Sequence, residues 1–162
     1  MANQEHMDIL KKGISAWNEW REAHPEVRPD LSKAELAGYC LIEANLTGVD
    51  LQEANLRGIQ GREAHLFSAN LERADLQDAQ LQDADLIAAN LPRANLGCAN
   101  LSKALLIMAN LQGADLRGAN LKEADLRDAN FQKAILDGVS LEAADMQGAS
   151  IPGEVVGSGD CR

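Results

Sequence analysis

Aromatic residues are scarce in this chain. They make up only 3% of its 162 residues, whereas abundant Leu and Ala raise the hydrophobic share to 46%. A core with so few aromatic side chains has to be assembled from many small and regular contacts. This favours an internally repeated structure, at a length typical of a single domain.

Positive charge is also in deficit. The chain has 15 Lys and Arg against 25 Asp and Glu, a formal net charge of −10. Direct nucleic-acid binding needs cations that neutralise phosphates, so we expect none. No segment approaches the roughly 20 apolar residues of a membrane span, and the start (MANQEHMDIL) lacks the features of a signal peptide. We therefore expect a cytoplasmic protein without a membrane partner.

Residues that could form a catalytic or metal-binding site are few and far apart in the sequence. His6, His24 and His65 are far apart, and no Cys or His pair has zinc-site spacing. The glycines are single, so there is no glycine-rich phosphate loop. The three cysteines are an odd number and widely separated, which indicates reduced thiols. We predict no catalytic residue, no metal site and no cofactor, and hence no enzyme.

A five-residue repeat dominates the chain from residue 31 to residue 151. Leu fills 21 of 25 positions at this spacing, and Ala fills 20 of the 24 positions two residues earlier. The residue between them is Asn or Asp in 16 of 25 repeats. The exceptions at the Leu position are Gly61, Phe131, Met146 and Ile151, and those at the Ala position are Tyr39, Val49, Ile59 and Val139.

A period of five fits neither an α-helix nor an extended strand. In a helix the leucines would spread over every face, and in a strand they would alternate between two faces. A backbone that turns once every five residues keeps Ala and Leu inside. Single glycines recur at the second turn position, for example Gly113 and Gly118, and Pro92 occupies the first. This chemistry predicts type II turns.

The repeat resembles the pentapeptide-repeat family. Residues 114–118 (ADLRG) and 119–123 (ANLKE) are typical of its Ala-(Asn/Asp)-Leu-X-X consensus. The resemblance implies an all-β solenoid, a right-handed quadrilateral β-helix with four pentapeptides, or 20 residues, per coil. It further implies about six coils, or about 30 Å of solenoid at ~4.8 Å per coil.

The chain divides into three segments. We expect residues 1–29 to form a capping α-helix and a linker, residues 30–153 the β-helix, and residues 154–162 a short flexible tail. Helical spacing places Met7, Leu10, Ile14, Trp17 and Trp20 on one face of the helix, over residues 3–23. This face is expected to cover the first coil; a ligand platform built from the two tryptophans is the alternative.

The sequence predicts no second capping helix at the C-terminal end, and strand edges that are left exposed favour pairing. One hypothesis is a homodimer through the C-terminal coil. The alternative is that Val155 and Val156 fold back over it.

Departures from the repeat are the places to look for function. Residues 20 apart stack, so an outward apolar stripe is expected at Phe67, Ile87, Leu105, Ile107 and Met108. Exposed apolar surface often marks a contact site. The other interpretation is that apolar residues accumulated at these positions without a function, or that the tail covers them. A second irregularity lies on the inside, where Gly61 replaces a Leu. We expect the larger side chains of Ile59 and Tyr39 to fill the volume that this Leu would occupy; the alternative is a small groove there.

The leading functional prediction is a non-enzymatic interaction or scaffolding module with an unknown protein partner. Mimicry of DNA toward DNA gyrase or another DNA-binding protein is an alternative, because residues 30–153 carry 18 acids and 10 bases. The interspersed bases and the unbroken five-residue register count against it. A purely structural spacer is the third candidate.

Overall fold

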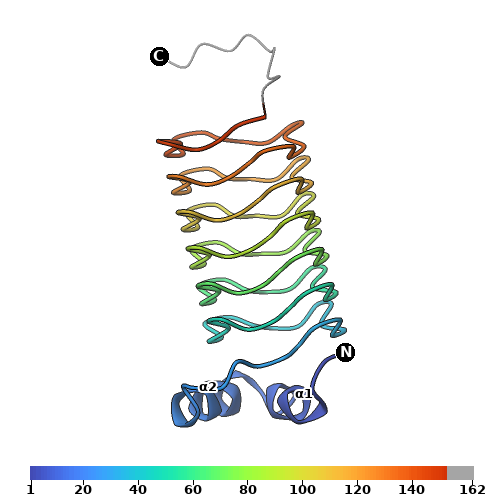
Figure 1. Ribbon diagram of the computed structural model, residues 1–162. Coiled ribbons are helices and arrows are strands. Elements are labelled where there is room, and N and C mark those ends of the chain that lie inside the picture. Colours follow the sequence, from blue (N-terminus) through green and yellow to red (C-terminus); the bar gives the residue numbers. More distant parts are fainter. Residues whose placement is uncertain (153–162) are drawn as a thin grey trace.

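The computed structural model describes residues 1–152 and consists of a β-helix with two short helices at one end (Figure 1). The helices are α1 (Gln4–Leu10) and α2 (Ile14–Ala23). The predicted fold class, a quadrilateral β-helix with a helical N-terminal cap, is confirmed.

Successive coils are joined by parallel bridges between residues 20 apart, from Asp30↔Asp50 to Asn130↔Ser150. Each side of a coil contributes one bridged residue, so no longer strand forms in the described residues. From Leu31 to Phe131 the amide of each central residue donates to the coil above, as from Leu71 to the Asn90 carbonyl at 2.7 Å. The Asn90 amide donates back to the Ala69 carbonyl at 2.9 Å. A four-sided coil of 20 residues follows from this register.

The corners are tight turns. The amide of Ala34 donates to the carbonyl of Leu31, and the same bond recurs along the solenoid. The second residue of each turn, from Lys33 to Gly148, has a positive φ between 53° and 74°, as the expected type II turn requires. Seventeen of these residues are not glycine. The bonds to neighbouring coils hold them in a conformation that an isolated chain would avoid.

The Leu and Ala columns fill the interior. From Leu31 to Phe131 every central position is buried, as are Ala74, Ala94 and their equivalents. Each buried Leu contributes roughly 1.5–3 kcal/mol against the opposing chain entropy. Turn positions and the Asn/Asp column point outward, so the packing of the core does not restrict them.

The N-terminal cap consists of two helices rather than the single helix expected over residues 3–23. That expectation was wrong at Lys11–Gly13, where Gly13 adopts a φ of 106° and the chain turns. Glycine reaches this conformation without steric cost. The spacing of the apolar residues alone does not reveal the break, because it continues across Gly13.

The cap supplies the contacts that a preceding coil would otherwise make. Leu10 and Trp17 are buried in the core, and Met7, Ile14 and Trp20 pack against it half-buried. Polar contacts complete the edge. They are Trp17 Nε1 to the Asn45 carbonyl (2.9 Å), Asn18 Nδ2 to the Glu43 carbonyl (3.0 Å), the Asn45 amide to Asn18 Oδ1 (2.8 Å) and Arg21 to the Thr47 carbonyl (2.8 Å). Burial lowers the pKa of Arg21.

Replacing Asn18 with Ala should destabilise the protein by roughly 1–3 kcal/mol, because the Asn45 amide and the Glu43 carbonyl lose their partner. Urea unfolding measures the change. Ser15→Ala in the same helix removes only an exposed bond to Glu19 and is the matched control. Equal stability of the Asn18 and Ser15 variants would contradict this account of the cap.

The vacancy at Gly61 is filled by its neighbours. A Cβ placed on Gly61 would lie 2.8 Å from Leu81 Cδ2 and 3.4 Å from Ile59 Cδ1. Gly61 and Ile59 are buried, and Tyr39, in the same column as Ile59 one coil away, is half-buried against the core. The space that a groove would need at Gly61 is therefore occupied by aliphatic side chains.

Restoring the consensus with Gly61→Leu should destabilise the protein by roughly 1–3 kcal/mol through overpacking. Ile59→Ala alone should cost roughly 2–4 kcal/mol by leaving a cavity. Since the two side chains compete for one space, the double variant should be more stable than the sum of the two changes predicts. Chemical denaturation of all four proteins gives the coupling energy, and strict additivity would contradict the shared space.

Candidate interaction surfaces

The apolar stripe, defined by Phe67, Ile87, Leu105, Ile107 and Met108, lies on one outer face of three successive coils. Phe67, Leu105 and Met108 are 43%, 39% and 59% exposed. Ile87 and Ile107 are half-buried. The stripe thus presents a continuous apolar column with two flanking side chains.

Polar residues end the stripe in both directions along the solenoid. Thr47 precedes Phe67 in the column, and Arg127 follows Ile107. Arg127 is held by Asp125, with Nε at 2.8 Å from Oδ1, and lies 3.9 Å from Asp145. The apolar segment is therefore a bounded patch of three coils, not a property of the whole face.

An open hollow adjoins the stripe at its N-terminal end. Its volume is about 360 Å³, and it lies between the linker after α2 and the first coils. The hollow is lined by Arg21, Pro25, Glu26, Val27, Arg28, Thr47, Gly48 and Ser68. Since Ser68 follows Phe67, the hollow extends the same face toward the cap.

The hydrogen bond from Arg127 lowers the pKa of Asp125 below its ordinary value. The folded state therefore holds Asp125 ionised at pH values where the unfolded chain, with a pKa of about 3.9, begins to protonate. This contribution to stability is present above about pH 4 and is lost as the pH falls through the lower, folded-state pKa.

Asp125→Asn should accordingly flatten the acid dependence of stability. The wild type should lose more of its urea midpoint than the variant between about pH 5 and 2, because only in the wild type does unfolding take up a proton at residue 125. Asn occurs at the equivalent position 45, so the coil itself tolerates the change. Parallel pH profiles of the two proteins would contradict the ion pair.

The C-terminal coil is a second exposed apolar surface. Leu141 and Ile151 occupy core positions but are 38% and 46% exposed, and Leu136 and Met146 are half-buried. In Figure 1 this coil lies at the end opposite α1 and α2. Val155 and Val156, which the alternative interpretation folds over this coil, lie outside the described residues.

One apolar residue on this coil was missed in the sequence. Ile135 is 42% exposed and follows Glu35, Asn55, Asp75, Asn95 and Asp115 in its outward column. The column comparison that revealed the stripe would have found it.

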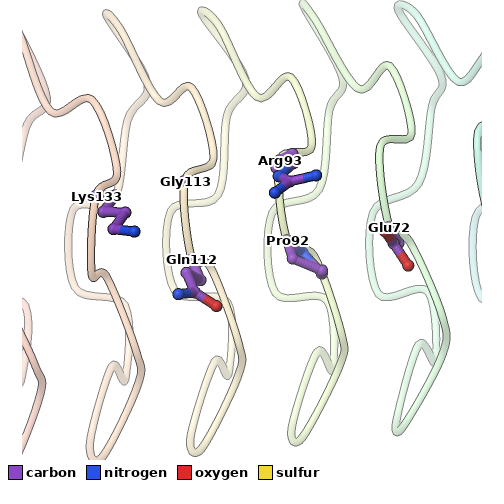
Figure 2. A pocket seen from close by; sticks show the side chains of 6 residues that line it. All are labelled: Glu72, Pro92, Arg93, Gln112, Gly113 and Lys133. Carbon is purple, nitrogen blue, oxygen red and sulfur yellow. The ribbon is translucent and has the colours of Figure 1, made fainter.

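A polar notch lies on the face of the solenoid that neighbours the stripe (Figure 2). It measures about 260 Å³ and is lined by Glu72, Pro92, Arg93, Gln112, Gly113 and Lys133. Because Gly113 has no side chain, Arg93 Cγ packs 3.6 Å from the place of a Cβ. The side chain of Lys133 points toward the Gly113 coil. Neither cation has an ion-pair partner within residues 1–152.

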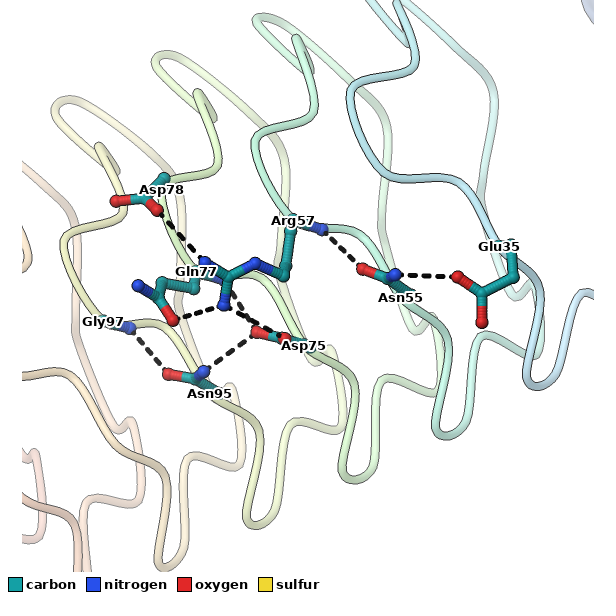
Figure 3. A network of polar contacts seen from close by, with 8 residues as sticks. All are labelled: Glu35, Asn55, Arg57, Asp75, Gln77, Asp78, Asn95 and Gly97. Carbon is teal, nitrogen blue, oxygen red and sulfur yellow. Dashed lines mark hydrogen bonds and ion pairs between the residues drawn. The ribbon is translucent and has the colours of Figure 1, made fainter.

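The outward Asn/Asp column forms bonds within and between coils. Asn95 Oδ1 accepts from the Gly97 amide two residues on, at 3.1 Å. The amide groups also bond across coils, as from Asn95 to Asp75 at 2.9 Å (Figure 3). Arg57 joins this network through Asp75 and Asp78. These contacts explain the prevalence of Asn and Asp structurally, so they need no functional role.

No grouping of three potential metal ligands occurs among residues 1–152. None of the helices in this part of the chain is long and apolar enough to cross a membrane. Cys40 and Cys98 are exposed and unbridged.

Comparison with known families gives one clear match. The model described as "Pentapeptide repeats" matches with 8 copies over residues 30–60, 44–82, 69–106, 79–122 and 109–148. A comparison with curated proteins gives no match.

Several solved structures are similar. HetL, a pentapeptide repeat protein involved in heterocyst differentiation regulation in Nostoc sp. strain PCC 7120, is 37% identical, with a TM-score of 0.42. The match covers 78% of this chain and 61% of HetL, so the chain spans only about three fifths of that protein. Rfr23 from Cyanothece 51142 is 29% identical over 84% of this chain and 94% of its own, with a TM-score of 0.41. QnrB1, a plasmid-mediated fluoroquinolone resistance protein, is 17% identical over 74% and 69%, with a TM-score of 0.36.

Proposed function

This chain belongs to the pentapeptide-repeat family, and we propose that it is a non-enzymatic interaction module that binds a protein partner through the apolar stripe. The observation that supports this most strongly is that three stacked coils place Phe67, Ile87 and Ile107 in one outward column, which is polar beyond both of its ends. Outward positions do not stabilise the core, so an apolar column there requires another reason. Contact with a partner supplies one.

The spacing of the stripe suits a helical partner. Coils recur every ~4.8 Å and helix turns every ~5.4 Å, so a helix along the solenoid can place one apolar side chain against each of three coils. The cations beside the stripe, Lys103 and Arg127, are paired with Glu123 and Asp125. This leaves the carboxylates Asp85 and Asp128 at its border. The partner that fits best is an amphipathic helix with an apolar ridge and basic flanks.

A variant with a polar stripe tests the proposal. Phe67→Gln, Leu105→Asn and Met108→Ser change the three most exposed members of the stripe to residues that their own columns contain at Gln147, Asn45 and Ser68. The fold should therefore persist. Partners captured from native extract by the wild type are identified, purified and titrated calorimetrically, and the variant should bind at least about tenfold more weakly, since several apolar contacts are lost.

The matched control is Gln77→Asp with Cys98→Asp, on the opposite face, which should bind as the wild type does. Equal binding by the polar-stripe variant would refute the proposal. Ile87→Asp with Ile107→Asp is a harsher version. It should abolish the contact without lowering thermal stability, and unfolding of that variant would mean that these two side chains serve the core.

The two competing functions have weaker support. Of the ten cations in residues 30–153, eight form ion pairs with neighbouring carboxylates, and this interrupts the acidic surface that a DNA mimic would need. A supercoiling assay with gyrase, with and without the protein, tests that reading. A structural spacer would leave the stripe without any partner.

A further inference from the structure

Two arginines line the open hollow between the linker after α2 and the first coils. Arg21 Nη1 donates to the Val27 carbonyl and its Nη2 to the Thr47 carbonyl, both at 2.8 Å. Arg28 Nε donates to the Gly48 carbonyl at 3.0 Å. Because these last two carbonyls belong to consecutive residues, the fold holds two positive charges at neighbouring places on the hollow.

No carboxylate among residues 1–152 pairs with either of these arginines. By contrast, five of the six arginines from Arg57 to Arg127 form ion pairs, all but Arg93. Arg21 is only 7% exposed, and its Nε has no hydrogen-bond partner in this part of the chain. Burial lowers its pKa, as it does for a cation without a counter-charge. An uncompensated charge at this depth is costly, so an anion bound beside it would stabilise the cap.

The need to complete the first coil does not explain the two charges. The cap has to supply donors to the carbonyls of this coil, and neutral groups do so beside the hollow. Trp17 Nε1 donates to the Asn45 carbonyl, and Asn18 Nδ2 donates to the Glu43 carbonyl. A guanidinium brings in addition a positive charge and further N–H groups, five in all, arranged to receive a carboxylate.

We propose that the hollow binds a carboxylate carried on a short apolar stem. The two guanidinium groups attract the carboxylate, and the hydroxyls of Thr47 and Ser68, which also line the hollow, can donate to it. Pro25 and Val27 supply apolar wall for the stem. The volume of about 360 Å³ exceeds what a single small ion fills, since one water molecule occupies about 30 Å³. The stripe takes no part, so this proposal is independent of the proposed function.

One carboxylate of the chain itself lines the hollow. Glu26 is exposed and forms no ion pair with either arginine. Two cations against one carboxylate leave the hollow positive, in a chain whose net charge is −10. Glu26 repels a bound carboxylate, so its charge should lower the affinity, whereas the charges of Arg21 and Arg28 should raise it.

Titration with sodium butyrate at constant ionic strength tests the site, followed by the amide NMR signals of the full chain. The signals of Thr47, Gly48 and Ser68 should shift saturably, with a dissociation constant in the millimolar range expected of so small a ligand. Butyramide has the same shape without the charge and should cause no such shift. Acetate, which lacks the apolar stem, should bind at least about threefold more weakly.

Variants of the hollow should change butyrate binding in opposite directions. Arg28→Gln keeps a hydrogen-bond donor at an exposed position and removes the charge, so it should weaken binding about tenfold. Glu26→Gln should tighten binding about twofold or more. The matched control is Arg93→Gln in the polar notch, which makes the same charge change at another unpaired arginine and should leave binding as in the wild type. Thermal unfolding checks that each variant is folded.

Three results would overturn the proposal. They are a lack of saturable shifts at the hollow, equal shifts with butyramide, and binding that is weakened by Arg93→Gln but not by Arg28→Gln. The carboxylate can come from a free acid or from an acidic residue of the protein that binds the stripe. In the second case butyrate should compete with that protein, and Arg28→Gln should weaken both; in the first, the affinity for that protein should not change.

Discussion

The hydrogen-bonded ladder between coils is the contact on which the rest of this structure depends. One coil alone cannot exclude water from its leucines; it needs a second coil stacked on each side. The ladder supplies that stacking and fixes each residue above the one 20 positions earlier. It also holds the second turn residues at positive φ, whether or not they are glycine. Two consequences follow: outward residues are released from the core, and both ends must be covered.

Much of this could be predicted from the sequence because a strict repeat makes local and global signals agree. The five-residue spacing of Leu and Ala predicts the coil, and residues 20 apart can then be compared column by column. That comparison located the stripe from Phe67 to Met108. Applied to the last coil, it would also have found Ile135.

Other features depend on contacts that no spacing encodes. The two-helix cap requires the turn at Gly13, and its polar contacts come from Trp17, Asn18 and Arg21 meeting carbonyls 25 to 28 residues away. Leu81 fills the space beside Gly61 from the next coil. The cross-coil amide bonds of Asn95 and its equivalents need three-dimensional distances. The repeat therefore determines the architecture, whereas the local structure at residues that depart from the repeat depends on how side chains pack in three dimensions.

Function, in this account, lies where the repeat is broken on the outside. The most direct measurement is site-specific photo-cross-linking in the protein's native cells, with the probe at Met108 in the stripe or at Cys98 on the opposite face. Both side chains are exposed at second turn positions, so the probe fits equally at each. The account predicts a discrete adduct to another protein from position 108 and none from position 98. Adducts from position 98 alone, or equally from both, would contradict it.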